Sequence, residues 1–194
     1  MMKMTLEFLN EECVYPECIE FIKENEMIGL KEIDSINKFI EYDKIVWANL
    51  LVIKFLNKID RVKYAVYAAE QVIDIYEKEH PNDKRPRKAI EAAKIYINNP
   101  NINNNEYSSI INAASNAHNA YTDMYSNNTA PYNVIRAGYA AYSASEAAYT
   151  VHGDTKNVEY SAINASVAAS DSELLIKIIR NGIEILKGEK NENN

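Results

Sequence analysis

Glycine and proline are scarce in this chain of 194 residues, which has five of each. Sheet-rich proteins need many tight turns, and those turns depend on these two residue types. Alternating apolar and polar runs, which are typical of strands, are also hard to find. The shortage argues against a sheet-based fold and favours an all-α protein, either a multi-helix bundle or a short helical-hairpin solenoid of about seven to nine helices. At 47% hydrophobic residues the chain has enough apolar surface for a continuous core.

Metal ligands and cysteines are equally few. Cys13 and Cys18 are the only cysteines, and their C-x4-C spacing matches no common zinc or redox motif. We expect both thiols to be reduced, with Cys18 on an apolar helix face. The three histidines, His80, His118 and His152, are too far apart in sequence for a zinc-protease motif. The sequence therefore predicts no metal site, no catalytic residues and no cofactor.

Long hydrophobic runs are absent as well. The most apolar stretch, residues 46–55, follows Lys44 and contains Lys54. It falls well short of the roughly 20 residues that a membrane span requires. The stretch is apolar on all sides, so we expect a central buried helix there. The N-terminal residues lack the apolar core of a signal peptide, because acidic residues interrupt them. These features predict a cytoplasmic protein without a membrane partner.

Positive charge is in deficit, with a net charge of −7 and a pI near 5.1. Duplex nucleic acids and anionic membranes are bound through basic surfaces that displace counterions. The charge therefore disfavours both classes of partner. A basic protein partner is compatible with it.

Composition divides the chain at residues 98–105, an asparagine-rich loop that contains Pro100. Residues 1–98 form an N-terminal helical half, in which a continuous apolar stripe from Val62 to Tyr76 predicts one helix. Residues 106–188 form a C-terminal helical half that is rich in alanine, tyrosine and serine. We expect one continuous domain. The tyrosines either pack between helices or form a binding surface, as tyrosines do in many interfaces.

The most informative segment, Asp83-Lys84-Arg85-Pro86-Arg87-Lys88-Ala89-Ile90-Glu91-Ala92, has the pattern of a helix start. Asp83 is suited to capping, and a first turn tolerates Pro86. Four cations nevertheless lie where the helix dipole is positive, an arrangement that costs about 0.3–1 kcal/mol for each exposed charge. An anion is expected to compensate them.

Two sources of that anion are open. Acidic residues of the chain lie nearby, and the like-charged pair Glu70 and Asp74 at i, i+4 itself needs a cation, for which Arg85 or Arg87 is the simplest candidate. Alternatively the anion is external, either a partner's carboxylates or a phosphate held by planar guanidinium groups. The chain has only five arginines, and two of them flank Pro86, which favours a geometric role.

The segment from Tyr64 to Ala93, an alanine-rich helix followed by D-x-R-P-R-x-A-I-E-A, resembles the immunity-protein-five-like group of bacterial polymorphic-toxin systems. Cys18 lies where that group tends to have a cysteine-containing helix, and Trp47 lies where it tends to have a helix rich in tryptophan and leucine. Residues 113–118 and 140–148 resemble its alanine-rich helices. The resemblance implies an all-helical binding protein without known catalytic residues.

Three hypotheses follow. In the first, the chain is a non-enzymatic immunity protein that binds and neutralises a toxin or effector, which we expect to be basic. In the second, it is an anion- or nucleotide-binding module, for example a sponge for a phosphorylated defence signal. The third, an enzyme, needs a cleft that joins His118, Glu146 and Arg136.

The residues assigned to binding fall into two groups. The candidates for protein or anion binding are Lys84, Arg85, Arg87, Lys88, Glu91 and Arg136. A possible secondary surface consists of His118, Tyr139, Tyr142 and Glu146. The sequence leaves the partner and the oligomeric state open, and a homodimer is compatible with it.

Overall fold

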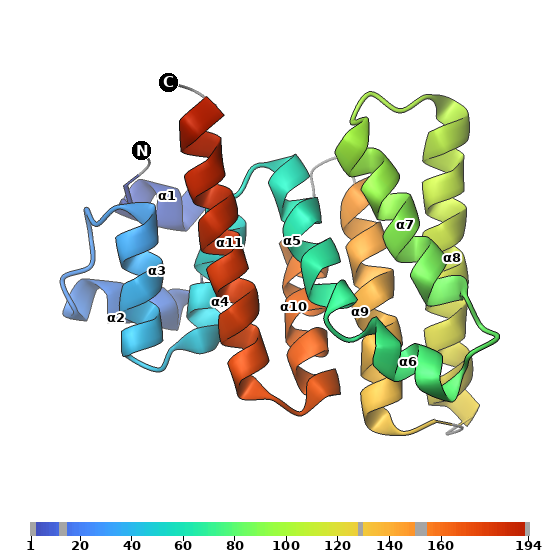
Figure 1. The fold of residues 1–194 in the computed structure, drawn as a ribbon. Helices are drawn as coiled ribbons and strands as arrows, with labels where there is room; N and C mark the ends of the chain where they lie inside the picture. The colour runs from blue at the N-terminus through green and yellow to red at the C-terminus, as the bar shows by residue number, and fades with distance from the viewer. Residues whose placement is uncertain (1–2, 12–14, 128–129, 150–154, 193–194) are drawn as a thin grey trace. The chain divides into compact units, whose positions relative to one another are not determined.

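A computed structural model describes residues 3–11, 15–127, 130–149 and 155–192. Within these ranges the chain is helical and forms no strand (Figure 1). The eleven helices described are α1 (Leu6–Glu11), α2 (Pro16–Glu24), α3 (Glu32–Glu41), α4 (Ile45–Phe55), α5 (Lys58–Glu70), α6 (Ile73–Glu79), α7 (Arg85–Asn98), α8 (Asn104–Asn127), α9 (Tyr132–Tyr149), α10 (Thr155–Ala169) and α11 (Ser172–Glu192). The all-α prediction is confirmed. None of the described helices is long and apolar enough to span a membrane.

The predicted number of seven to nine helices is too low, for two reasons. The short helix α1 has only one buried residue, Leu9, and so shows no apolar stripe. The predicted single helix up to Tyr76 is in fact α5 and α6, separated at Gln71 and Val72. There the backbone N–H groups bond three residues back, to Ala68 and Ala69, which tightens and ends α5. Both helices bury their apolar sides against α9, so the stripe continues across the break.

The chain divides into two compact units. Unit 1 comprises Met1–Leu56 and Ile179–Asn194, and unit 2 comprises Asn57–Ile178. The asparagine-rich loop at residues 98–105, which the sequence predicts to separate two halves, lies inside unit 2 between α7 and α8. The division into halves at this loop stays a prediction.

The core of unit 1 includes α4, the helix expected to be central. Its buried residues are Ala48, Asn49, Leu50, Leu51, Val52, Ile53 and Phe55. Trp47 packs edge-on against Phe21 and Phe39, with ring centroids 5.4 and 5.9 Å apart. Cys18 is fully buried on α2 and free, as predicted, and burial raises the pKa of its thiol to about 12. Cys13 lies outside the described residues.

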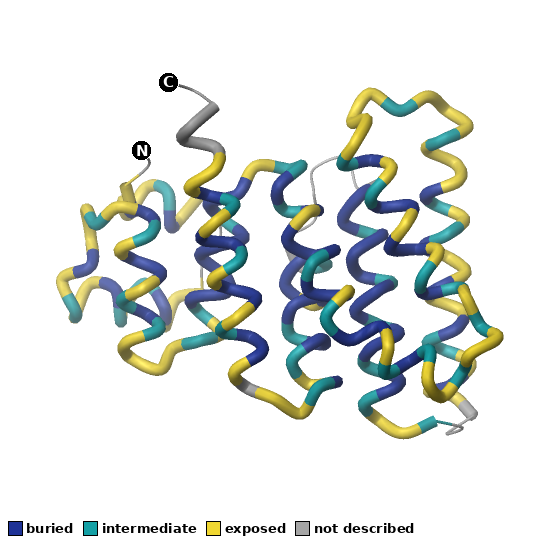
Figure 2. Tube along the Cα trace, viewed as in Figure 1, coloured by how far each residue is buried: buried dark blue, intermediate teal, exposed yellow. Residues whose placement is uncertain are grey.

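Unit 2 is built in two layers. Helices α5 and α7 form one layer and α8, α9 and α10 form the other, and α9 contacts α5, α6, α7, α8 and α10 (Figure 1). In a solenoid each repeat contacts only its neighbours, so this arrangement is that of a bundle. Figure 2 shows that most of α9 is buried. Its buried positions are mainly alanines and serines, which lets the neighbouring helices approach closely.

A buried hydroxyl ties three helices of unit 2 together. The Ser161 side chain on α10 lies 2.8 Å from the carbonyl oxygen of Ala65 on α5 and 3.0 Å from that of Ala140 on α9. Its hydroxyl has one hydrogen to donate, shared between these two acceptors. A larger residue would not fit, because Ala65 and Ala140 are themselves fully buried. Small side chains thus fix the position of α9, the helix from which several candidate site residues project.

Candidate functional site

The predicted basic segment forms what we call the arginine corner, defined as Asp74, Glu77, Asp83, Arg85 and Arg87. Helix α7 begins at Arg85, and Pro86 lies in its first turn, where the missing N–H costs no hydrogen bond. Asp83 precedes the helix, and its Oδ1 accepts a hydrogen bond from the Arg85 backbone N–H at 3.0 Å. The sequence predicted the position of this helix start correctly, but Lys84 and not Asp83 is the N-cap residue, and its side chain makes no capping bond.

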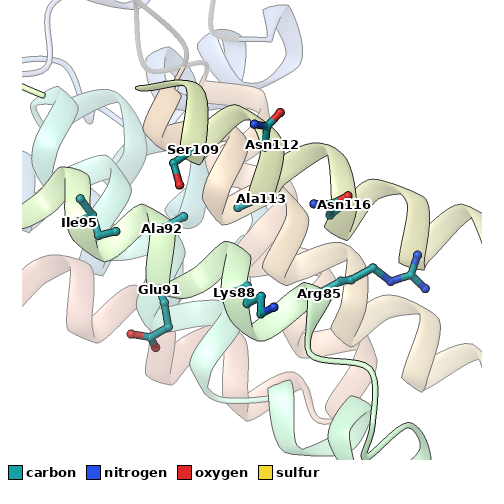
Figure 3. A pocket seen from close by; sticks show the side chains of 9 residues that line it. All are labelled: Arg85, Lys88, Glu91, Ala92, Ile95, Ser109, Asn112, Ala113 and Asn116. Carbon is teal, nitrogen blue, oxygen red and sulfur yellow. The ribbon is translucent and has the colours of Figure 1, made fainter. Parts of the chain in front are cut away.

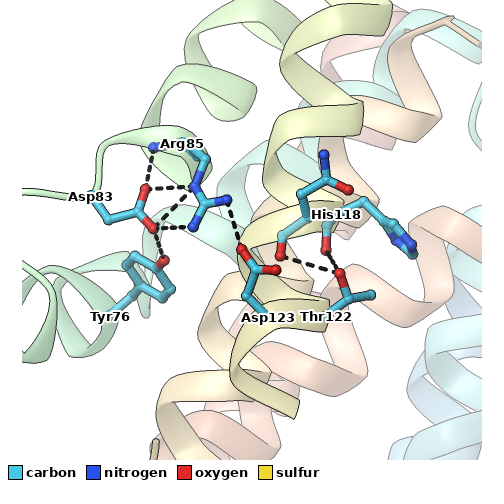
Figure 4. A network of polar contacts seen from close by, with 7 residues as sticks. Tyr76, Asp83, Arg85, His118, Thr122 and Asp123 are labelled. Carbon is cyan, nitrogen blue, oxygen red and sulfur yellow. Dashed lines mark hydrogen bonds and ion pairs between the residues drawn. The ribbon is translucent and has the colours of Figure 1, made fainter. Parts of the chain in front are cut away.

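Arg85 is held by two carboxylates (Figure 4). Its Nη2 donates to Asp83 Oδ2 at 2.8 Å, and its Nε lies 3.0 and 3.1 Å from the two Asp83 oxygens. Its Nη1 donates to Asp123 on α8 at 3.1 Å. The hydroxyl of the buried Tyr76 also donates to Asp83, at 2.7 Å. Asp83 therefore joins α6 to the start of α7 through one carboxylate.

Arg87 is paired just as closely. Its Nη2 donates to Glu77 at 2.6 Å and to Asp74 at 3.2 Å, and its Nε donates to Glu77 at 3.2 Å. Lys84 also contacts Glu77, at 3.4 Å. The like-charged pair Glu70 and Asp74 is thereby neutralised, because Arg87 covers Asp74 and Lys94 contacts Glu70 at 2.7 Å.

These contacts shift the pKa values of the corner. Burial alone would raise the pKa of Asp83, but hydrogen bonds from Arg85 and Tyr76 outweigh it and lower that pKa to about 2. Burial and the bond to Asp83 raise the pKa of Tyr76. Hydrogen bonds from Arg87 lower the pKa of Glu77. Asp83 and Glu77 are thus ionised at neutral pH, where they pair with Arg85 and Arg87.

The anions that compensate three of the four cations are therefore residues of the chain itself. Lys88 is the exception, because the part of the chain that the structure describes contains no carboxylate in ion-pair contact with it. An external anion at Arg85 or Arg87 would have to displace carboxylates that already form good hydrogen bonds. A binding role for these residues stays a prediction.

Lys88 lines a groove between α7 and α8, which we call the α7–α8 groove (Figure 3). Its volume is about 400 Å³. The residues lining it are Arg85, Lys88, Glu91, Ala92, Ile95, Ser109, Asn112, Ala113 and Asn116. Glu91, the other predicted site residue here, contacts Lys94 at 2.9 Å. Most of the lining side chains are polar, and Ile95 is the large apolar one that is exposed.

A second feature lies on the layer formed by α8, α9 and α10. Six aromatic side chains from the three helices form a continuous set of ring contacts, with centroids 4.6–6.3 Å apart. We call this set the tyrosine surface: His118, Tyr121, Tyr125, Tyr139, Tyr142 and Tyr160. In Figure 4 the His118 ring points away from the side of α8 on which Arg85 meets Asp123.

The predicted secondary surface falls within or beside this set. His118 contacts Tyr142, with ring centroids 4.9 Å apart, and Tyr142 contacts Tyr139 at 5.6 Å. Glu146 forms a hydrogen bond with Tyr142. Burial, which is the larger cause, and the negative charge of Glu146 raise the pKa of Tyr142 to about 12. The structure thus brings these four residues together. Their binding role stays a prediction.

Arg136 lies on α9 and faces α10, not the arginine corner with which the sequence grouped it. Its Nη1 donates to Asn164 on α10 at 2.8 Å, and its Nη2 donates to the Tyr132 hydroxyl. The guanidinium carbon lies 4.6 Å from the Tyr132 ring centroid. Its charge also acts on Tyr139, so Arg136 borders the tyrosine surface.

Sequence reasoning missed four residues of these sites: Tyr121, Tyr125, Tyr160 and Asp123. The spacing of His118, Tyr121 and Tyr125 at three and four residues would have placed them on one helix face. Nothing in the sequence links Asp123 with Arg85, 38 positions earlier. Among the described residues no three histidine, cysteine or carboxylate side chains cluster as metal ligands.

Comparison with protein families identifies the family of the chain. The family model described as Imm-5 like putative immunity protein covers residues 52–187. The chain belongs to this family. No curated protein and no solved structure matches it significantly.

The Imm-5-like match includes all of unit 2, so the arginine corner, the α7–α8 groove and the tyrosine surface all lie inside the family region. It also confirms the resemblance inferred from the D-x-R-P-R-x-A-I-E-A segment. Residues 1–51 lie outside the match.

Proposed function

We propose that this Imm-5-like chain is a non-enzymatic immunity protein that binds a protein toxin or effector and neutralises it. The observation that carries the proposal is the family match over residues 52–187. Immunity by direct binding needs a stable surface and no catalytic machinery. The tyrosine surface on α8, α9 and α10 supports the proposal, and the bonds of the arginine corner join α6 and α7 of the same unit.

The net charge of −7 supports a basic partner, such as a toxin that itself binds nucleic acid. Complementary charge accelerates the encounter of two proteins and disfavours wrong partners. An immunity protein must capture its toxin before damage occurs, so fast association is valuable. We place its action in the cytoplasm, where the nucleic acids that such a toxin attacks lie.

Co-expression with a co-encoded toxin tests the proposal. Cells that express the active toxin are expected to grow only when this chain is present. A catalytically inactive form of the toxin, used to keep the cells alive, is expected to co-purify with the chain in a defined stoichiometric ratio. Absence of both the complex and the growth rescue would refute the proposal.

The second candidate is the anion- or nucleotide-binding module. The observation that favours it is the α7–α8 groove, whose volume of about 400 Å³ suits a small ligand and whose Lys88 has no ion-pair partner in the described structure. Calorimetry with inorganic phosphate and with nucleotides tests it. Binding that Lys88→Ala abolishes would support this function, and absence of any binding would remove it.

A further inference from the structure

We propose that the tyrosine surface is the docking site for the toxin and that it receives a basic face of that protein. The proposal rests on the proposed function and names its interface. Its starting point is exposure: Tyr125 is 64% exposed and Tyr160 is 43% exposed, although each ring touches a neighbouring tyrosine. Large aromatic rings left open to solvent on a helical layer indicate a contact surface.

The rings are already held in place before any partner binds. Tyr139 is at the centre, in contact with Tyr121 at 4.6 Å, Tyr142 at 5.6 Å and Tyr160 at 6.3 Å between centroids. Binding a mobile side chain costs about 0.5–1.5 kcal/mol of conformational entropy, and rings that are held by their neighbours avoid part of that cost. Tyrosine also supplies apolar contact area together with a hydroxyl for hydrogen bonding.

The chemistry of the surrounding helices fits a protein rather than a nucleic acid. Residues 104–170 contain five acidic residues and only two basic residues, Arg136 and Lys156. Arg136 is committed to Asn164 and Tyr132. Single-stranded nucleic acids also stack on aromatic rings, but they need cations along their phosphates. Depletion of charge around exposed tyrosines is instead typical of the centre of a protein interface.

The carboxylate beside the rings and the ring faces themselves indicate a positively charged partner. Glu146 is bonded to Tyr142 and acts electrostatically on Tyr139, so a carboxylate lies within the surface. The faces of tyrosine rings attract cations, as Arg136 over Tyr132 demonstrates within the chain. Arginine or lysine side chains of the partner therefore find both ring faces and a carboxylate here. The α7–α8 groove is less suited to a basic partner. Its charged residues Arg85 and Glu91 are already in ion pairs, and the remaining one, Lys88, is itself a cation.

Affinity measurements with the inactive toxin test this interface. The double variant Tyr125→Ala/Tyr160→Ala is expected to weaken binding at least about 30-fold, in the range of interface hot spots. The corresponding Tyr→Phe double variant keeps the rings and is expected to bind within about fivefold of the wild type. Glu146→Gln is expected to weaken binding and to reduce its dependence on salt.

A matched control variant tests whether the loss of binding is specific to the tyrosine surface. Tyr42→Ala removes from unit 1 a tyrosine whose exposure, 41%, is close to that of Tyr160, and it is expected to bind like the wild type. Circular dichroism and thermal unfolding establish that each variant is folded.

Wild-type affinity in a folded Tyr125→Ala/Tyr160→Ala variant would overturn the assignment of the interface while leaving the proposed function intact. So would sedimentation showing that these tyrosines hold two copies of the chain together. Failure of the wild-type chain to bind any toxin would refute the proposed function itself.

Discussion

Asp83 and Arg85 form a bidentate ion pair at the start of α7, with Arg85 Nη2 2.8 Å from Asp83 Oδ2 and Arg85 Nε 3.0 Å from Asp83 Oδ1. The same carboxylate accepts the Tyr76 hydroxyl and the Arg85 backbone N–H. One aspartate therefore anchors a buried ring, a helix start and a guanidinium group. From this concentration of contacts we expect the pair to contribute to the stability of the fold.

The first prediction compares two aspartates of the corner. Asp83→Ala removes the carboxylate that accepts hydrogen bonds from the Tyr76 hydroxyl and from Nε and Nη2 of Arg85. We therefore expect a loss of about 2–3 kcal/mol in the free energy of unfolding. Asp74→Ala removes only a carboxylate that is 92% exposed, and we expect a loss of less than about 0.5 kcal/mol. Urea unfolding of both variants provides the measurement. Equal losses would show that Asp83 has no special role.

The second prediction concerns pH. The folded-state pKa of Asp83, about 2, is below the ordinary value of 3.8, so its ionised form stabilises the fold above about pH 4. This stabilisation is lost as the pH falls from about 4 toward 2. We expect the stability difference between the wild type and Asp83→Asn to be about 1–2 kcal/mol at pH 7, after allowance for solvent screening, and to shrink below pH 4. A difference that does not change with pH would contradict this role.

The third prediction uses two helical glycines. A Cβ added at Gly138 on α9 would lie 3.2 Å from the Tyr76 ring, which is buried and tied to Asp83 and so cannot move aside. We expect Gly138→Ala to destabilise the fold by about 1–3 kcal/mol. At Gly188 on α11 a Cβ would meet nothing within 4 Å, so Gly188→Ala is expected to stabilise by up to about 1 kcal/mol. Thermal unfolding should shift in opposite directions for the two variants.

The fourth prediction concerns the hydroxyl between α5, α9 and α10. Ser161→Ala removes a buried hydrogen bond between helices and is expected to cost about 1 kcal/mol, whereas Ser161→Leu is expected to cost at least about 3 kcal/mol because Ala65 and Ala140 leave no room. Ser166→Ala is the control, because the Ser166 hydroxyl bonds within its own helix. Its stability should be close to that of the wild type. A Ser161→Leu variant as stable as the wild type would show that the packing is looser than described.

The sequence was sufficient for features that depend on neighbouring residues. The all-round apolar character of residues 46–55 predicted the buried helix α4, and Asp83 with Pro86 predicted the start of α7. The break between α5 and α6 could not be seen, because Ile73 and Tyr76 continue the apolar stripe of α5 against the same helix.

Contacts between distant residues were beyond sequence reasoning. The carboxylates near Arg87 were predictable because Asp74 and Glu77 lie on the preceding helix, but Asp123 reaches Arg85 only through the packing of α8 against α7. The tyrosine surface likewise could not be predicted, because its rings come from three helices, α8, α9 and α10, that only the fold brings side by side. The sequence supplied His118, Tyr139 and Tyr142 as candidates, and the fold added Tyr121, Tyr125 and Tyr160.

The most direct test of toxin neutralisation is a titration of the purified toxin's activity with the purified chain. We predict that inhibition rises linearly and is complete at a fixed, near-stoichiometric ratio, and that the Tyr125→Ala/Tyr160→Ala variant needs a large excess for the same inhibition. Undiminished toxin activity in the presence of excess folded wild-type chain would contradict neutralisation by direct binding.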